Sequence, residues 1–244
     1  MKESALQWLD SIAGCFFPNV CQFCHDERAA REQGYIGSKC WGRLRFLRSP
    51  FCQCCGLPFE GALSSTFRCP HCQTGSFAFS GARAALVANE FSLGLIHRYK
   101  YHRNEWLEVV LAEFLWNQLQ RLGMQSGWDA VVPVPLFSSK QREREFNQAE
   151  RMGRFLSRRM GAPLAGHVLK RVAPTLSQTM LSRSERRRNV HQAFAPATSE
   201  GLTGKRVMLV DDVFTTGATS NACARVLRRM GASGVWVCTV VRGL

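Results

Sequence analysis

The clearest chemistry in the sequence lies in a stretch close to its C-terminal end. Two carboxylates, Asp211 and Asp212, follow the apolar residues 207–210, and a loop rich in hydroxyl groups comes next. Ionised carboxylates only accept hydrogen bonds, so they suit sugar hydroxyls or a cation. The loop leads into a helix, and the unpaired N–H groups of a helix N-terminus bind phosphate. The order of these groups predicts a site for a sugar phosphate.

The loop over residues 214–220 is expected to hold the phosphate. It offers several hydroxyl groups, and a glycine there lets a phosphate oxygen approach the backbone closely. A helix cap would need only one such residue, so capping alone explains the loop poorly. A nucleotide P-loop fits less well, because no G-x-x-x-x-G-K-[ST] pattern is present. The loop positions expected to contact the ligand are Thr215, Thr216, Gly217, Ala218 and Thr219.

A second anion site is expected after an earlier strand. Residues 129–135 are typical of a strand that its prolines end, and the basic stretch 136–148 then leads into a helix over 147–160. Such a loop favours pyrophosphate, although a solvated basic face is the alternative. The basic side chains expected at the pyrophosphate are Lys140, Arg142 and Arg144.

A third basic stretch could close over the same anion. Residues 175–194 are polar and have no long apolar face, which predicts a long loop. Long loops in compact domains are often lids or binding loops. Arg186 and Arg187 are therefore further candidates for contacting pyrophosphate.

Cysteine spacing predicts a structural zinc site in the first third of the chain. Cys52 and Cys55 form one C-x-x-C pair, and Cys69 and Cys72 form another. Two such pairs fit a closed, tetrahedral site of four thiolates, which we call the second cysteine cluster. Cys54 is expected to be a bystander within it.

The first cysteine cluster, Cys21, Cys24 and Cys40, is less complete. A matching second pair would need a thiolate at residue 37, where Gly37 stands. Three thiolates leave one zinc position open, unless these cysteines simply pack as small apolar residues. The pairs could also interleave with those of the second cluster. The residues that could complete the first site are Cys15, His25, Cys54 and His71.

The elements around these sites indicate an α/β domain with a parallel sheet over residues 76–244, preceded by a cysteine-rich module over 1–75. A strand is expected near 84–88 and a helix over 91–101. A second helix is expected from an N-cap at Asn104 to Gly123, and a third over 221–230. In the 91–101 helix, the residues expected to point outward as scaffold are His97, Arg98 and Lys100.

Charge and composition narrow the partners and the compartment. Residues 1–75 carry 8 basic and 6 acidic groups, which leaves +12 of the formal +14 for residues 76–244. Such a field attracts phosphorylated ligands and nucleic acid alike. No secretory signal or apolar membrane span is visible, so we expect a cytoplasmic protein without membrane insertion. There, clustered cysteines favour metal binding over disulfides.

The central stretch V-D-D-V-F-T-T-G-A-T resembles the phosphoribosyl pyrophosphate (PRPP) loop of type I phosphoribosyltransferases. The resemblance implies that Asp211 and Asp212 hold the ribose hydroxyls and that residues 215–219 hold the 5′-phosphate. With the cysteine pairs, V-P-V-P-L, F-N-Q, S-Q-x-x-L and R-R-R-N-V, the chain resembles the ComF/GntX family, which is associated with DNA uptake in competence and use of external DNA. Two positions depart from its pattern: Gly37 lacks a cysteine, and Glu145 replaces a glycine.

Two functions follow from this resemblance. The first is transfer of a phosphoribosyl group from PRPP with release of pyrophosphate, in which Mg²⁺ bridges the departing group. Such a reaction needs positioning more than a protein nucleophile, and the sequence singles out no catalytic residue. The alternative is a non-catalytic accessory protein that senses PRPP, a related phosphorylated ribose or a nucleotide, or that binds single-stranded DNA or competence proteins.

Overall fold

The computed structural model describes residues 20–29, 35–61, 66–101, 106–173 and 193–244. The chain divides into two compact units, Met1–Leu44 and Arg45–Leu244. Several predicted features lie outside the described residues. They are Cys15, the N-cap Asn104, and most of the basic loop over 175–194, including Arg186 and Arg187.

The first unit is built around a short helix and the first cysteine cluster. Helix α2 (Ser38–Trp41) buries Cys40, and Gly37 precedes it in an extended conformation. Val20 and Arg28 form an isolated antiparallel bridge. The turn that this bridge closes contains Cys21, Cys24 and Glu27.

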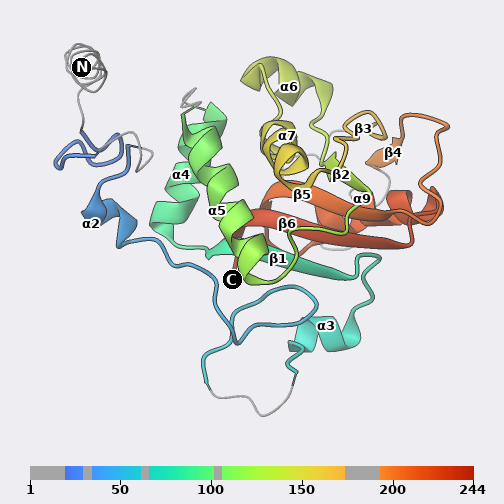
Figure 1. Ribbon diagram of the computed structural model, residues 1–244, viewed down its shortest axis with the longest axis horizontal. Helices are drawn as coiled ribbons and strands as arrows, with labels where there is room; N and C mark the ends of the chain where they lie inside the picture. The colour runs from blue at the N-terminus through green and yellow to red at the C-terminus, as the bar shows by residue number, and fades with distance from the viewer. Residues whose placement is uncertain (1–19, 30–34, 62–65, 102–105, 174–192) are drawn as a thin grey trace, which may run out of the picture. The chain divides into compact units, whose positions relative to one another are not determined.

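A four-stranded parallel sheet forms the centre of the second unit (Figure 1). Its order is β1-β6-β5-β2. Each neighbouring pair is parallel, and the strands are buried along most of their length, as expected for a sheet covered on both faces. The parallel α/β prediction is confirmed. The strands are β1 (Gly81–Val87), β2 (Ala130–Pro133), β5 (Arg206–Phe214) and β6 (Gly234–Arg242).

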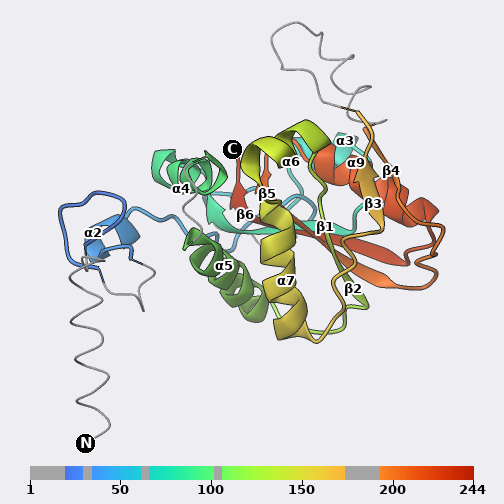
Figure 2. The same ribbon diagram turned by 90° about the horizontal axis from the view of Figure 1, so that it is seen from above.

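Helices cover the two faces of this sheet (Figure 2). Helices α5 (Leu107–Arg121) and α7 (Gln148–Met160) pack on each other and on one face. Helix α9 (Ala218–Arg229) packs on the other. The expected apolar stripe of α5 is buried, which confirms its 3.6-residue period. Its members are Leu107, Val110, Leu111, Phe114, Leu115 and Leu119.

Several shorter elements accompany the parallel sheet. Helix α4 (Glu90–Tyr101) follows β1, and helix α6 (Ser138–Arg144) follows β2. Strands β3 (Leu169–Arg171) and β4 (Phe194–Pro196) pair antiparallel with each other in a separate two-stranded sheet. Helix α3 (Pro70–Thr74) carries Cys72.

Among the differences from the sequence prediction, two concern elements next to the aspartates and the basic loop. Strand β5 continues past residue 210, because Asp211 pairs with Thr239 and Val213 with Val241 of β6. Aspartate has a low strand preference, and the neighbouring strand overrides it. The predicted basic loop contains α6, whose Lys, Gln, Arg and Glu residues are good helix formers.

The second cysteine cluster packs into the same core as the parallel sheet. Cys52, Cys55, Cys69 and Cys72 belong to one apolar cluster with residues of β2, β5, β6 and α9. Ala82 of β1 donates its N–H to the Cys54 carbonyl at 2.7 Å. These contacts join residues on the two sides of the predicted domain boundary at residue 75. The boundary itself stays a prediction.

Candidate functional site

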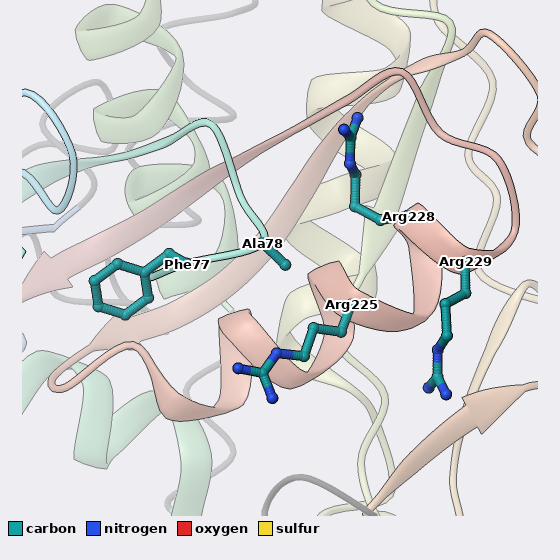
Figure 3. A pocket seen from close by; sticks show the side chains of 5 residues that line it. All are labelled: Phe77, Ala78, Arg225, Arg228 and Arg229. Atoms are coloured by element: carbon teal, nitrogen blue, oxygen red, sulfur yellow. The ribbon is translucent and has the colours of Figure 1, made fainter. Parts of the chain in front are cut away.

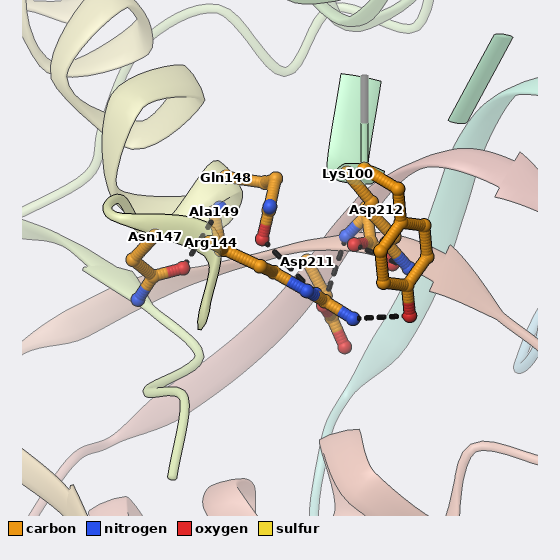
Figure 4. A network of polar contacts seen from close by, with 8 residues as sticks. Lys100, Arg144, Asn147, Gln148, Ala149, Asp211 and Asp212 are labelled. Carbon is orange, nitrogen blue, oxygen red and sulfur yellow. Dashed lines mark hydrogen bonds and ion pairs between the residues drawn. The ribbon is translucent and has the colours of Figure 1, made fainter. Parts of the chain in front are cut away.

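Side chains from four elements meet at the carboxyl edge of the parallel sheet. Ligands of α/β proteins bind at this edge because the loops that leave parallel strands gather there. Figure 4 shows Lys100 from α4, Arg144 from the end of α6, Gln148 from α7 and the two aspartates of β5 in one polar network. The fold therefore gathers residues from three separate stretches of the sequence.

Lys100 makes the shortest ion pair within this network. Its Nζ lies 2.7 Å from Asp212 Oδ2, and the two side chains are only 20% and 14% exposed. The expectation that Lys100 is an outward scaffold residue is wrong. It lies in the last turns of α4, where its long apolar stem carries the ammonium group to the end of β5. A ligand at Asp212 therefore also meets the positive charge of Lys100.

The pKa of Asp211 is raised by its surroundings. Burial raises its pKa to about 7, and the adjacent Asp212 carboxylate acts in the same direction. The N–H of Asp212 donates to Asp211 Oδ1 at 2.9 Å, and Lys100 and Arg171 offset the rise only in part. An aspartate with a strongly shifted pKa, at the edge where parallel strands end, is typical of a functional site.

Arg171 is a residue of this site that the sequence analysis missed. It ends β3, lies opposite Phe194 of β4, and places its guanidinium 5.4 Å from the centroid of that ring. Burial lowers the pKa of Arg171, while the charge of Asp211 acts to raise it. The sequence offered only the basic pair Lys170 and Arg171 as a signal.

Arg144 is the predicted pyrophosphate residue that the fold buries. It is 9% exposed, donates to Tyr101 Oη at 2.8 Å and to Gln148 Oε1 at 3.3 Å, and lies over the Tyr101 ring. Within the described part of the chain, Arg144 Nε and Gln148 Nε2 are buried donors without a hydrogen-bond partner. Buried donors are nearly always paired, so these two are suited to an acceptor on a ligand.

The other predicted pyrophosphate residues are placed differently. Lys140 and Arg142 are exposed on α6. Arg186 and Arg187 lie outside the described residues. Asn147 caps α7, accepting from Ala149 N at 3.0 Å and donating to the Val134 carbonyl at 3.1 Å. This cap fixes the direction in which the chain leaves α6.

The threonine loop, residues 215–219, is shaped by Gly217. This glycine has a φ of 77°, and a Cβ there would lie 2.5 Å from Phe214 Cζ. Both the left-handed backbone and the adjacent ring therefore require glycine. Thr215 and Thr216 are exposed, and Thr216 Oγ1 accepts from Ala218 N at 3.4 Å. The loop presents hydroxyl and N–H donors at the start of α9.

Arg242 connects this loop to the second cysteine cluster. It is 7% exposed, and its Nε donates to the Cys55 carbonyl at 2.9 Å. Its Nη1 donates to the carbonyls of Phe214 at 3.3 Å and Thr215 at 2.9 Å, and its Nη2 lies 3.5 Å from Cys55 Sγ. One buried guanidinium thus orients both a cysteine knuckle and the start of the threonine loop.

The second cysteine cluster has the geometry of a tetrahedral zinc site. The four sulfur atoms lie within 4.8 Å of one another, and Cys55 Sγ lies 3.6 Å from Cys69 Sγ. Zinc–sulfur bonds of about 2.3 Å require sulfur atoms about 3.8 Å apart. Burial opposes ionisation of Cys52, but backbone N–H groups, with that of Cys69 at 3.4 Å, lower its pKa to about 7. These residues fit structural zinc.

Buried cations balance the charge that such a site would carry. Four thiolates around Zn²⁺ have a net charge of about −2, which is costly to bury alone. Arg83, 7% exposed, donates to the Gln53 carbonyl at 3.0 Å, beside Cys52. Together with Arg242 it supplies two guanidinium groups next to the knuckle. Cys54 is not part of the four-sulfur group.

The first cysteine cluster gains a member that the sequence analysis did not consider. Ligand atoms of Cys21, Cys24, Cys40 and Glu27 lie within 4.8 Å of one another. Among the described candidates for the fourth position, His25 is not in this group. Cys54 and His71 belong to the second unit of the chain.

The parallel sheet and its carboxylate and threonine loop define a phosphoribosyltransferase-like protein with a cysteine-rich N-terminal part. Two family models match the chain in agreement with this class. A double zinc ribbon domain matches residues 12–74, and a phosphoribosyl transferase domain matches residues 148–244. The zinc ribbon match and the cysteine geometry together support structural zinc.

Relatives extend the likeness over nearly the whole chain. The DNA utilization protein YhgH of Salmonella typhimurium is 30% identical over 233 residues, which cover 93% of this chain and 98% of the relative. Competence protein F of Haemophilus influenzae is 36% identical over 152 residues, covering 61% of this chain and 66% of the relative. The chain belongs to the ComF/GntX family, as its motifs predicted.

Solved structures show weaker likeness. A purine phosphoribosyltransferase from Pyrococcus horikoshii is 16% identical, with 57% of this chain and 82% of that chain covered and a TM-score of 0.35. A likeness at this level adds nothing to the fold described above. Among the described residues, no helix combines the length and apolar character that a membrane span requires.

Proposed function

We propose that the carboxyl edge of the parallel sheet binds PRPP. Asp211 and Asp212 accept hydrogen bonds from the ribose hydroxyls, and the threonine loop donates to the 5′-phosphate. The observation that carries the proposal is the pair of unpartnered buried donors, Arg144 Nε and Gln148 Nε2, beside the two aspartates. Pyrophosphate oxygens would satisfy both donors.

The chemistry we propose is phosphoribosyl transfer. The bond between ribose C1′ and the pyrophosphate oxygen breaks, the pyrophosphate leaves with the electron pair, and an acceptor atom bonds to C1′. The developing charge is positive on the sugar and negative on the leaving group, so the carboxylates and Arg144 act on opposite ends. Asp211 would be the residue to hold Mg²⁺, which when bound would supply further neutralisation of the leaving group.

Zinc has a structural role in this proposal. Cys52, Cys55, Cys69 and Cys72 would hold one ion in a closed, four-thiolate site. Arg242 links this cysteine cluster to the threonine loop, because it donates hydrogen bonds to the carbonyls of Cys55 and Thr215. Metal binding would therefore contribute to the fold of the site and take no part in the reaction.

The test is PRPP binding and turnover in matched variants. Calorimetry with Mg²⁺ should show binding by the wild type, and Asp212→Asn should weaken it by about 1–3 kcal/mol, the scale for an unpaired polar partner. Glu150→Gln, which changes an exposed ion pair of α7 with Arg154, is the control and should leave affinity unchanged. Pyrophosphate release is then measured with nucleobases, amines and oligonucleotides as acceptors.

Two outcomes contradict different parts of this proposal. Absence of binding by the wild type at millimolar PRPP would refute the assignment of the ligand. Binding without pyrophosphate release for any acceptor would instead favour a PRPP sensor. Either result would leave the zinc assignment intact, because metal content is measured separately.

A second candidate function is binding of single-stranded nucleic acid. Arg225, Arg228 and Arg229 of α9 line a hollow with Phe77 and Ala78 (Figure 3). Phe77 is half-buried, and arginines beside an aromatic ring are the usual components of a single-strand contact. Arg228 is held in place by the Ala232 carbonyl at 2.8 Å. The relatives named for competence and DNA utilization make DNA the nucleic acid to test.

The salt dependence of binding separates this function from the first. Single-strand affinity should fall with salt at a log–log slope of about −0.7 per phosphate contacted, and reversing charge at Arg225 and Arg229 should flatten that slope. Asp212→Asn should leave DNA affinity unchanged. If the arginine variants bind DNA as the wild type does, the hollow beside α9 is not the contact surface.

A further inference from the structure

Glu27 occupies the space where a side chain at residue 37 would stand. A Cβ built on Gly37 would lie 2.2 Å from Glu27 Cδ and 2.6 Å from its Oε1. Real atoms do not approach so closely, so Glu27 in this position and any side chain at residue 37 exclude each other. The carboxylate takes the place, next to three cysteines, that the absent side chain leaves open.

Neighbouring donors fix the orientation of this carboxylate. Oε2 accepts from the backbone N–H of Lys39 at 2.8 Å and from Ser38 Oγ at 3.3 Å. Oε1 accepts from the N–H of Cys40 at 3.0 Å. Such hydrogen bonds are typical of the outer contacts that orient a metal-binding carboxylate. Glu27 is half-buried, and these bonds hold its side chain in one arrangement at a cost in side-chain entropy.

The distances to the sulfur atoms match a metal site. Cys24 Sγ lies 3.6 Å from Glu27 Oε1, and the ligand atoms of all four residues lie within 4.8 Å of one another. In a tetrahedral zinc site, bonds of about 2.3 Å to sulfur and about 2.0–2.2 Å to oxygen place these atoms about 3.5 Å apart. Oε1 is therefore the oxygen in position to bind.

We infer that Glu27 is the fourth ligand of a zinc site completed by Cys21, Cys24 and Cys40. The site holds Zn²⁺ through three thiolates and one carboxylate oxygen, and it is independent of the proposed PRPP site. Oxygen suits harder cations better than thiolate does, so this site releases zinc faster than the second cysteine cluster. Gly37 is necessary because it leaves room for the carboxylate.

Metal content of the full-length protein tests this inference. The wild type should hold two equivalents of zinc, and a chromogenic chelator should remove them in two phases. Glu27→Gln should weaken the faster site by at least about 100-fold, since even changes to outer contacts of a ligand cost 10–100-fold. Asp26→Asn, the adjacent acidic residue, is the matched control and should retain both phases.

A change of ligand type provides a second readout that does not depend on loss of fold. Glu27→Cys should retain two zinc ions, slow the fast phase of release, and increase the sulfur-to-metal absorption of the cobalt-substituted protein. Gly37→Cys alone should disturb the site through its collision with Glu27, whereas Gly37→Cys with Glu27→Ala should restore two zinc ions.

Three results would overturn the inference. One is wild-type zinc content and release in Glu27→Gln. Another is a cobalt spectrum unchanged by Glu27→Cys. The third is loss of the faster zinc in Cys15→Ser but not in Glu27→Gln, which would identify Cys15 as the fourth ligand.

Discussion

Replacing Arg242 with methionine should weaken the threonine loop and the second cysteine cluster together. Methionine has a similar length but no donors, so it removes the guanidinium without leaving a large cavity. The substitution takes away the bonds to the carbonyls of Cys55, Phe214 and Thr215. It also removes the cation beside Cys55 Sγ.

The expected loss of unfolding free energy is about 3–5 kcal/mol. The carbonyls of Cys55 and Thr215 lose a donor at about 1–3 kcal/mol each, whereas the Phe214 carbonyl keeps the N–H of Gly243 at 2.8 Å. Removing one partner of a buried charged interaction likewise costs about 3–5 kcal/mol. Arg242→Lys keeps the charge but reaches fewer acceptors, so its loss should be about half as large.

Urea unfolding, zinc release and PRPP titration measure the three consequences. We expect Arg242→Met to lower stability, accelerate loss of zinc from the second cluster, and weaken PRPP binding about tenfold, which corresponds to about 1.4 kcal/mol. Arg229→Gln, an exposed substitution on α9, should change stability by less than about 0.5 kcal/mol. Arg242→Met with wild-type stability and wild-type zinc release would refute the coupling.

Three further predictions follow from individual residues. The pKa of Asp211 is raised to about 7 in the fold, so the contribution of this residue to stability should decline as the pH rises from about 4 to 7. PRPP affinity should instead rise through about pH 7 as the carboxylate ionises. Asp211→Asn should abolish both trends in urea and calorimetric titrations. Glu145 has a φ of 65°, so Glu145→Gly should raise the free energy of unfolding in urea by about 1 kcal/mol. Glu143→Gly, inside α6, should lower it. Metal analysis should show loss of one zinc in Cys55→Ser and no loss in Cys54→Ser. Equal losses in the two variants would contradict the assignment of Cys55 as the ligand.

Features that depend on residues close together in the sequence were predictable. The C-x-x-C spacing identified Cys52, Cys55, Cys69 and Cys72, because a knuckle is formed by a few consecutive residues. The periodic apolar residues of α5 and the helix predicted over 147–160, observed as α7, are local for the same reason. The family motifs also indicated the parallel α/β class, which the strand pairing confirms.

Features that depend on distant segments needed the tertiary structure. Helical spacing placed Lys100 outward, but periodicity cannot show which loop end lies beside a helix terminus, and Asp212 lies there. The end of β5 was predicted too early because its last residues are held by β6 and not by their own preference. Arg171 joins the site only through the pairing of β3 with β4.

The sequence by itself determined the kinds of chemistry in this protein, namely carboxylates before a threonine loop, thiolates in pairs, and an excess of positive charge. The tertiary structure decided which groups act on one another. Arg242 reaches the carbonyl of Cys55 across 187 residues of sequence, and Glu27 reaches the space beside Gly37 because the fold brings these two residues together. Hydrogen bonds and ion pairs act over a few ångströms, so contacts between distant residues depend on the path of the folded chain.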